Sequence, residues 1–295
     1  MKKRWKARLL NGAGFLFLWV VLLGNAWGAR PEGPALTREE LANQANAPLS
    51  SIMQVRLRDT WIPKYEHLSG KSNLFGIDVT MPLPAYRLLP IRHLTRLTIP
   101  AVLTNPDHKT GGGDLRFMDL AILRERKHFL WGIGPTLVMP TADDRRFGQG
   151  KWQIGPAGGF AVMSKRCLAG LIVQNPMSVG GDKDRRPVND LFLQPFVTYQ
   201  LGRGWFVRSQ PQIYFNLERG EKVFPVDFGA GNTFNLRGHM ISWYVQPYWN
   251  FSGSERAYPR YGVSVGITFL FPNFWKNAGG LWDRYRHAPE DKNEE

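Results

Sequence analysis

Gly262-Val-Ser-Val-Gly-Ile-Thr-Phe-Leu-Phe271, the last apolar run of the chain, decides the fold. Its odd-numbered residues are all large and apolar, whereas Ser264, Gly266 and Thr268 are small or polar. Because alternate residues of a β-strand point to opposite faces, this period of two predicts a strand with one strongly apolar face. Such a face needs either a packed protein core or lipid around it.

The same alternation occurs one segment upstream, between residues 243 and 251. Trp243, Val245, Trp249 and Phe251 fall on one face, and the residues between them are mostly polar. From Ser51 onward we expect 12 strands of roughly 10 to 14 residues, longer than the 5–6 residues of an ordinary strand. A tilted strand needs about 9–11 residues to cross a bilayer. The expected strands are 51–62, 72–82, 91–103, 114–123, 128–140, 152–163, 167–177, 188–200, 205–216, 223–236, 239–251 and 261–271.

The connections between these strands alternate in length, as they do in outer-membrane barrels. The short ones are Arg124–Lys127, Ser164–Arg166, Leu201–Gly204 and Leu236–Gly238. The long, charged, Gly-rich ones are Asn105–Gly113, Thr141–Lys151, Ser178–Pro187 and Ser252–Pro259. Two connections break the alternation: Pro84–Pro90 is long on the short side, and Glu218–Glu221 is short on the long side.

These patterns predict an all-β fold, an up-and-down antiparallel transmembrane β-barrel of about 12 strands. In lipid every backbone group must be paired internally, so the strands must close into a ring. We expect two aromatic girdles, formed by Trp61, Trp131, Trp152, Trp205, Trp243 and Phe271. Proline inside a strand removes a ladder donor and argues against this fold unless it lies at a bulge. Such prolines follow glutamine at positions 195, 211 and 247.

The N-terminus predicts export. Five basic residues precede the apolar stretch Ala13–Leu23, and Ala26-Trp27-Gly28 is typical of a signal-peptidase site. Eleven apolar residues are too few to span a bilayer as an anchor. We therefore expect an outer-membrane location and this division: 1–28 signal peptide, 29–50 periplasmic lead-in, 51–272 β-barrel and 273–295 C-terminal tail.

The chain is basic, with a formal net charge of +14, which falls to +9 without the five basic residues of the signal. For an exported protein, such charge favours lipopolysaccharide, acidic lipid and anionic solutes over nucleic acid. The expected partners are outer-membrane lipid or lipopolysaccharide, the barrel-assembly machinery and an unidentified small-molecule solute, with no nucleic acid. The single Cys167 excludes an intramolecular disulfide. We expect a monomer.

Catalytic and metal chemistry have little support in the sequence. Gly262–Gly266 matches G-x-S-x-G, but that motif needs a sharp strand-to-helix turn, and here it lies within an alternating strand. Some 12-stranded outer-membrane barrels are phospholipases, yet no local His–Ser signature surrounds His67, His93, His128 or His239. One Cys and scattered His do not form a zinc site. We expect no enzyme activity, no metal and no cofactor.

The interior face is the remaining place for function. If the large apolar register faces outward, the predicted lumen residues are Arg96, Arg116, Arg208, Gln194, Gln210, Gln212, Gln246, Tyr248 and Asn250. Basic rings favour anions in a pore, and the amides and the phenol can hydrogen-bond a polar solute. Alternatively, these residues bond one another and fill a closed lumen, as in small barrels.

An ordered set of segments resembles the outer-membrane barrels labelled "MetA-pathway of phenol degradation", some of which carry the name neuromedin U. The resemblance covers about residues 45–272 and rests on Leu41–Asn46, Pro48–Ile52, Leu130–Asp144, Gly150–Pro156, Gly181–Arg185, Val188–Phe196 and Val265–Pro272. It implies an outer-membrane barrel that passes small, in part aromatic, compounds, and it implies no site residues. Residues 273–295 depart from the pattern; a periplasmic tail, a plug and a disordered extension are the alternatives.

The sequence therefore predicts a passive channel for small solutes, aromatic or anionic in character. A structural or adhesive barrel with a plugged lumen is the second hypothesis. A lipid-modifying enzyme is the third.

Overall fold

The computed structural model describes residues 52–85, 91–126, 128–237, 239–251 and 258–271, and they form 16 β-segments. No helix among these residues is long and apolar enough to cross a membrane. The segments are β1 (Met53–Glu66), β2 (Ser72–Leu83), β3 (His93–Thr104), β4 (Thr110–Gly111), β5 (Leu115–Arg126), β6 (Phe129–Met139), β7 (Lys151–Met163), β8 (Cys167–Gln174), β9 (Met177–Gly181), β10 (Asp190–Gly202), β11 (Trp205–Ser209), β12 (Ile213–Asn216), β13 (Glu221–Asp227), β14 (Gly229–Leu236), β15 (His239–Phe251) and β16 (Tyr258–Phe271).

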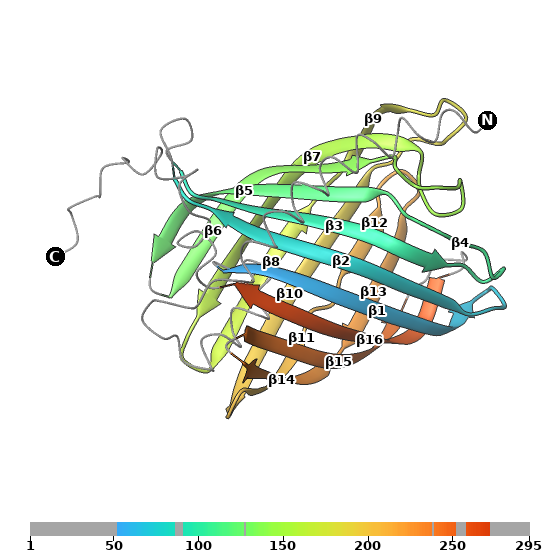
Figure 1. The fold of residues 1–295 in the computed structure, drawn as a ribbon. Helices are drawn as coiled ribbons and strands as arrows, with labels where there is room; N and C mark the ends of the chain where they lie inside the picture. The colour runs from blue at the N-terminus through green and yellow to red at the C-terminus, as the bar shows by residue number, and fades with distance from the viewer. Residues whose placement is uncertain (1–51, 86–90, 127, 238, 252–257, 272–295) are drawn as a thin grey trace.

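The segments make a closed antiparallel barrel of 12 strands, which confirms the predicted fold. Four strands are each split in two, since β4 and β5 both pair with β3, β8 and β9 with β7, β11 and β12 with β10, and β13 and β14 with β15. The ring closes where β1 pairs with β16, in a register that runs from Met53↔Phe271 to Glu66↔Tyr258. Figure 1 shows these two strands, blue and red, side by side in the tilted wall.

Each predicted strand corresponds to one strand of the barrel, but three of them are interrupted. The predicted strand 167–177 is broken at Asn175–Pro176, 205–216 is broken at Gln210–Gln212, and 223–236 is broken at Phe228. The expected signal peptide, lead-in and tail lie outside the described residues. So do positions 86–90 of the long connection that the sequence marks as an exception.

The prolines at positions 195, 211 and 247 explain the breaks at Gln210–Gln212 and Phe228. β10 pairs with β12 up to Leu193↔Ile213 and with β11 from Val197↔Ser209, so Pro195 lies opposite Pro211 where both ladders lack a donor. Asp227 supplies hydrogen bonds where the ladder ends after β11. Its Oδ1 accepts hydrogen bonds from Ser209 Oγ (2.9 Å) and the Gln210 amide (2.8 Å). The carbonyl of Pro247 accepts the Phe228 amide (3.2 Å) at the break between β13 and β14.

The two ends of the barrel differ, as the loop lengths predict. At the turn end, the strands join through the short connections 127–128, 164–166, 203–204 and 237–238, of which residues 127 and 238 lie outside the described residues. The loop end carries the connections 67–71, 105–114, 140–150, 182–189 and 217–220, together with 252–257, which lie outside the described residues. Trp61, Trp152 and Trp249 lie near the loop end and Trp131, Trp205, Trp243 and Phe271 near the turn end, so the strand order places aromatic residues at both levels.

The outward face of the wall is apolar and exposed. On β16, Val265 and Ile267 are 44% and 42% exposed, whereas Gly266 and Thr268, which point inward, are buried. Exposed large apolar side chains occur on strands all around the ring. A soluble sandwich would bury this face, so its extent indicates a lipid environment.

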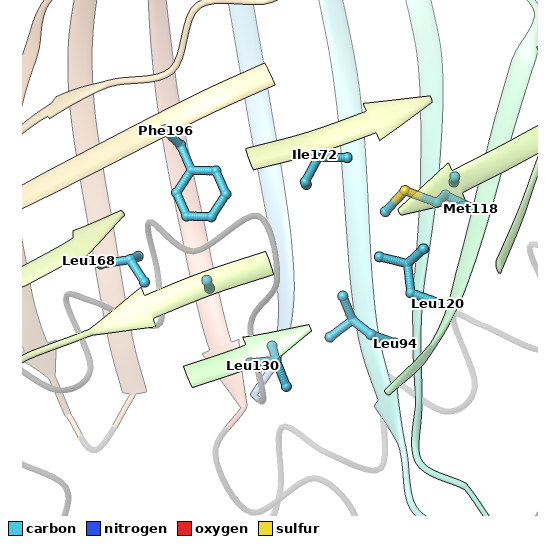
Figure 2. Packing of buried hydrophobic residues seen from close by; sticks show 9 residues of the cluster. Leu94, Met118, Leu120, Leu130, Leu168, Ile172 and Phe196 are labelled. Carbon is cyan, nitrogen blue, oxygen red and sulfur yellow. The ribbon is translucent and has the colours of Figure 1, made fainter. Parts of the chain in front are cut away.

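An apolar layer fills the turn half of the lumen on the side formed by strands β3 to β10. Leu94 and Leu130 are the second residues of β3 and β6, and Ala161 is near the end of β7, so these buried side chains lie close to the turns. Figure 2 shows the side chains of this layer, which come from several different strands. The layer comprises Leu94, Met118, Leu120, Leu130, Ala157, Ala161, Leu168, Ile172 and Phe196.

Candidate functional site

A cavity of about 700 Å³ lies in the lumen beside the apolar layer, and Met118 belongs to the lining of the one and to the other. It is built by the inward register of the strands, because side chains two positions apart on a strand share a face. The structure places all nine predicted lumen residues on its lining: Arg96, Arg116, Arg208, Gln194, Gln210, Gln212, Gln246, Tyr248 and Asn250.

The cavity is also lined by three arginines that sequence reasoning missed. Arg56 and Arg58 lie on β1, where they alternate with outward Val55 and Leu57, so the period-two pattern carried their signal. Arg146 comes from the connection between β6 and β7, and no strand pattern could have placed it.

The charges of the lining are unequal. Six arginines face the cavity against three carboxylates, Asp78, Asp114 and Asp227. Asp78 lies 3.7 Å from Arg58 and also accepts a hydrogen bond from Thr98 Oγ1 (2.7 Å). Asp227 accepts its hydrogen bonds at the proline break, and Asp114 bonds backbone amides, as described below. The cavity therefore has an excess of positive charge.

Three of the cavity arginines pack against aromatic rings. The guanidinium of Arg208 lies 4.0 Å from the ring centroid of Tyr244, and that of Arg56 lies 5.9 Å from the same centroid. Arg116 lies 5.5 Å from the ring of Phe192. Cation–π contacts of this kind hold a guanidinium over a ring while its N–H groups remain able to donate.

The connection between β6 and β7 does not extend away from the barrel. Its residues Thr141–Gly150, called here the inner loop, place Arg146, Phe147, Gly148 and Gln149 on the lining of the cavity. Asp114 holds both of its ends, since its carboxylate accepts the amides of Ala142 (3.1 Å) and Gln149 (2.7 Å). The inner loop thus narrows the loop side of the lumen.

Inside the inner loop, Arg146 and Asp144 form a bidentate ion pair. Arg146 Nε and Nη2 each donate to the Asp144 carboxylate at 2.9 Å. This charge-assisted contact holds the pKa of Asp144 at about 2, well below its ordinary value. The pair fixes the direction of the only cavity-lining arginine, among the described residues, that a loop supplies.

Comparison with solved structures finds the same architecture. An outer-membrane channel from Pseudomonas putida F1 matches with a TM-score of 0.56 and 11% identity, over 77% of this chain and 98% of the other. The chain has the fold of an outer-membrane channel. The NanC porin matches with a TM-score of 0.50 and 11% identity, over 74% of this chain and 98% of the porin. The Escherichia coli outer-membrane phospholipase A, at a TM-score of 0.40 and 12% identity over 80% and 98%, is too distant to carry an argument.

Sequence comparisons add nothing to this likeness. No family model matches the chain, and no curated protein matches it.

The G-x-S-x-G segment has a structural role in the barrel wall. β16 runs without a turn through Gly262–Gly266, and the hydroxyl of Ser264 lies 2.9 Å from that of Thr60 on β1. A Cβ on Gly262 would lie 2.6 Å from the Tyr248 hydroxyl, and one on Gly266 would lie 2.3 Å from Tyr244 Cε1. Both glycines make room for tyrosines of the lumen.

One histidine has a carboxylate partner that the sequence did not indicate. His93 Nδ1 lies 2.8 Å from Asp119 Oδ2, and both residues are in the outward register of β3 and β5. Thr95 is the hydroxyl residue paired with Asp119 in register, but it donates its hydrogen to the Met81 carbonyl (3.1 Å) and is not directed at the histidine. The described residues contain no group of three or more potential metal ligands.

Proposed function

We propose that this chain is an outer-membrane barrel through which small solutes diffuse, with a preference for anions. The observation that carries the proposal is the lumen lining, where six arginines face three carboxylates. A pore wall with excess positive charge attracts anions and repels cations. The fold shared with outer-membrane channels supports this function.

We also propose the finer assignments that the sequence suggests. These are export by a cleavable signal peptide, contact with lipopolysaccharide, insertion by the barrel-assembly machinery and membership of the phenol-degradation barrel family. The lumen chemistry is compatible with an aromatic carboxylate, since guanidinium groups bind carboxylates and Tyr244 and Phe192 are present as aromatic surfaces. Enzymatic activity has no comparable support.

A structural barrel without transport is the second candidate, and one observation favours it. The apolar layer fills the turn half of the lumen on the β3–β10 side, and its members are nearly all inaccessible. In a channel, this layer is a barrier that the solute must pass.

Planar-bilayer recording decides between the two candidates. We expect the folded protein to give discrete conductance steps and a zero-current potential of anion-selective sign in a salt gradient. The double variant Arg96→Glu and Arg116→Glu should lower the anion-to-cation permeability ratio severalfold, because it reverses two charges on the lining.

The control is Lys64→Glu with Lys71→Glu, two exposed residues of the same charge outside the lining. This variant should keep the wild-type selectivity. A barrel that runs faster unheated than boiled on a detergent gel, and yet gives no conductance, would overturn the channel proposal in favour of the structural barrel.

A further inference from the structure

A second cavity of about 650 Å³ lies at the loop end, and we call it the vestibule. Its wall is formed by three separate segments: the inner loop, residues 184–188, and residues 214–221. Its size is within the range of small-molecule sites. Tyr214 and Asn216 line it from the strand β12, in the inward register that they share with Gln212, so it opens on the lumen side of the wall and is a place for a free solute rather than a lipid headgroup.

Arginines dominate the vestibule. Arg145, Arg185, Arg186 and Arg219 line it, against two carboxylates, Asp184 and Glu221. The guanidinium groups come from all three wall segments, so they approach the hollow from different directions. Planar guanidinium forks match carboxylate and phosphate groups, which makes this arrangement suited to an anion with more than one such group.

Arg185 has a donor that nothing in the described structure uses. Its Nη2 donates to the Arg145 carbonyl, which fixes the side chain between two wall segments. Its Nε is buried and has no hydrogen-bond partner among the described residues. Fixed by its contact with Arg145, Arg185 is a preordered member of the vestibule wall.

The vestibule and the lumen cavity are adjacent chambers. Gly148 and Gln149 line both of them, so the inner loop is the partition. Gln149 is held at this position, because its amide donates to Asp114 (2.7 Å) and its side chain donates to Asp190 (3.1 Å). A solute that enters from the loop side meets the arginines of the vestibule before those of the lumen.

We propose that the vestibule is a binding site for a small anion carrying two or more carboxylate or phosphate groups, and that it captures this anion before passage. The binding site stands on the vestibule's own residues. Only its role as the first step of passage rests on the proposed channel function.

Isothermal titration of the folded barrel in detergent with inorganic diphosphate tests the binding site. The variant Arg186→Ala with Arg219→Ala removes two guanidinium groups of the lining, of which that of Arg219 lies 3.8 Å from the Glu221 carboxylate. We expect diphosphate affinity to fall about tenfold or more, given that a hydrogen bond to a charged group contributes about 1.5–3 kcal/mol. The matched control is Lys183→Ala with Lys222→Ala, which removes the same charge from exposed positions outside the lining. It should change the affinity less than twofold by general electrostatics.

A third variant, Arg96→Ala with Arg116→Ala, separates the vestibule from the lumen. It should retain the vestibule affinity. If diphosphate fails to bind the wild type, or if the lysine control loses as much affinity as the arginine variant, the site does not exist. If only the lumen variant loses binding, the anion site is in the lumen and the vestibule proposal is wrong, while the proposed function stands.

Single-channel recording tests the role in passage. Diphosphate added on the loop side should block the current at lower concentration than diphosphate on the turn side, and the Arg186/Arg219 variant should abolish this asymmetry. Equal block from both sides would contradict capture before passage. Binding that persists in a barrel without conductance would overturn the channel function and leave the binding site intact.

Discussion

The smallest residues of the inner wall determine where its largest ones lie. Tyr244 packs over Gly266 of the neighbouring strand, so close that a Cβ there would lie 2.3 Å from the ring. The guanidinium of Arg208 lies 4.0 Å from the centroid of the same ring. Because position 266 has no side chain, the ring of Tyr244 can lie against it. The ring in turn positions Arg208 in the cavity.

Gly266→Val tests this positioning. The valine side chain cannot fit without moving Tyr244, and overpacking of this kind costs about 1–3 kcal/mol. We expect the ring and Arg208 to move into the cavity, which lowers the single-channel conductance. The barrel should also lose its fast-migrating gel form at a lower temperature.

The control for this substitution is Val265→Ile, one position away on the outward face. It adds one methylene group toward lipid and should leave both conductance and stability unchanged. Unaltered conductance in Gly266→Val would show that Tyr244 does not border the conducting path.

The inner loop is the element that most alters the shape of the lumen. Its hydrogen bonds come from a distant part of the chain: Asp114 is 28 residues from Ala142 and 35 from Gln149. The sequence placed Thr141–Lys151 correctly as a long, charged connection between two strands. Its inward course could not be predicted, because that course depends on a carboxylate in another connection and not on any local pattern.

Asp114→Asn should release the inner loop. The substitution removes the charge and turns one acceptor into an NH2 donor that faces a backbone amide. Each charge-assisted bond lost contributes about 1.5–3 kcal/mol. We expect a larger single-channel conductance and faster proteolytic cleavage between residues 141 and 150. Anion selectivity should weaken because Arg146 leaves the lining.

Asp107→Asn is the matched control, since it removes the same charge from an exposed residue of the same connection, 105–114. It should reproduce none of these effects. A variant at Asp114 with wild-type conductance and protease resistance would mean that the remaining contacts, such as the Asp143 carboxylate with the Gly112 amide (2.7 Å), suffice to hold the inner loop.

At the scale of the whole barrel, the period of two was enough to predict 12 strands and the register that points Arg96 and Gln246 inward. The period of two gives the wrong face for some large apolar residues. The rule that large apolar residues face lipid would turn Leu120 and Ile172 outward, yet they share the inward register with Arg116 and Gln174. A single strand cannot reveal this, because these residues are buried by packing against other strands across the lumen.

The apolar layer is the barrier that any solute must pass, and Phe196 is its largest member. It is 3% exposed and lies against β8, where a Cβ on Gly170 would be 2.5 Å from its Cζ. Phe196→Ala should open the layer and raise the single-channel conductance. Loss of a buried phenylalanine also costs about 3–5 kcal/mol, so the fast-migrating gel form should disappear at a lower temperature.

Phe160→Ala is the control for this change, because Phe160 is 40% exposed on the outward face of β7. It should lose less stability and keep the wild-type conductance, since lipid fills the space that the ring leaves. If Phe196→Ala stays folded and conducts like the wild type, solute passes beside the apolar layer and not through it. The path then follows the wall formed by β14 and β15, where the paired residues Thr233 and Ser242 carry hydroxyl groups.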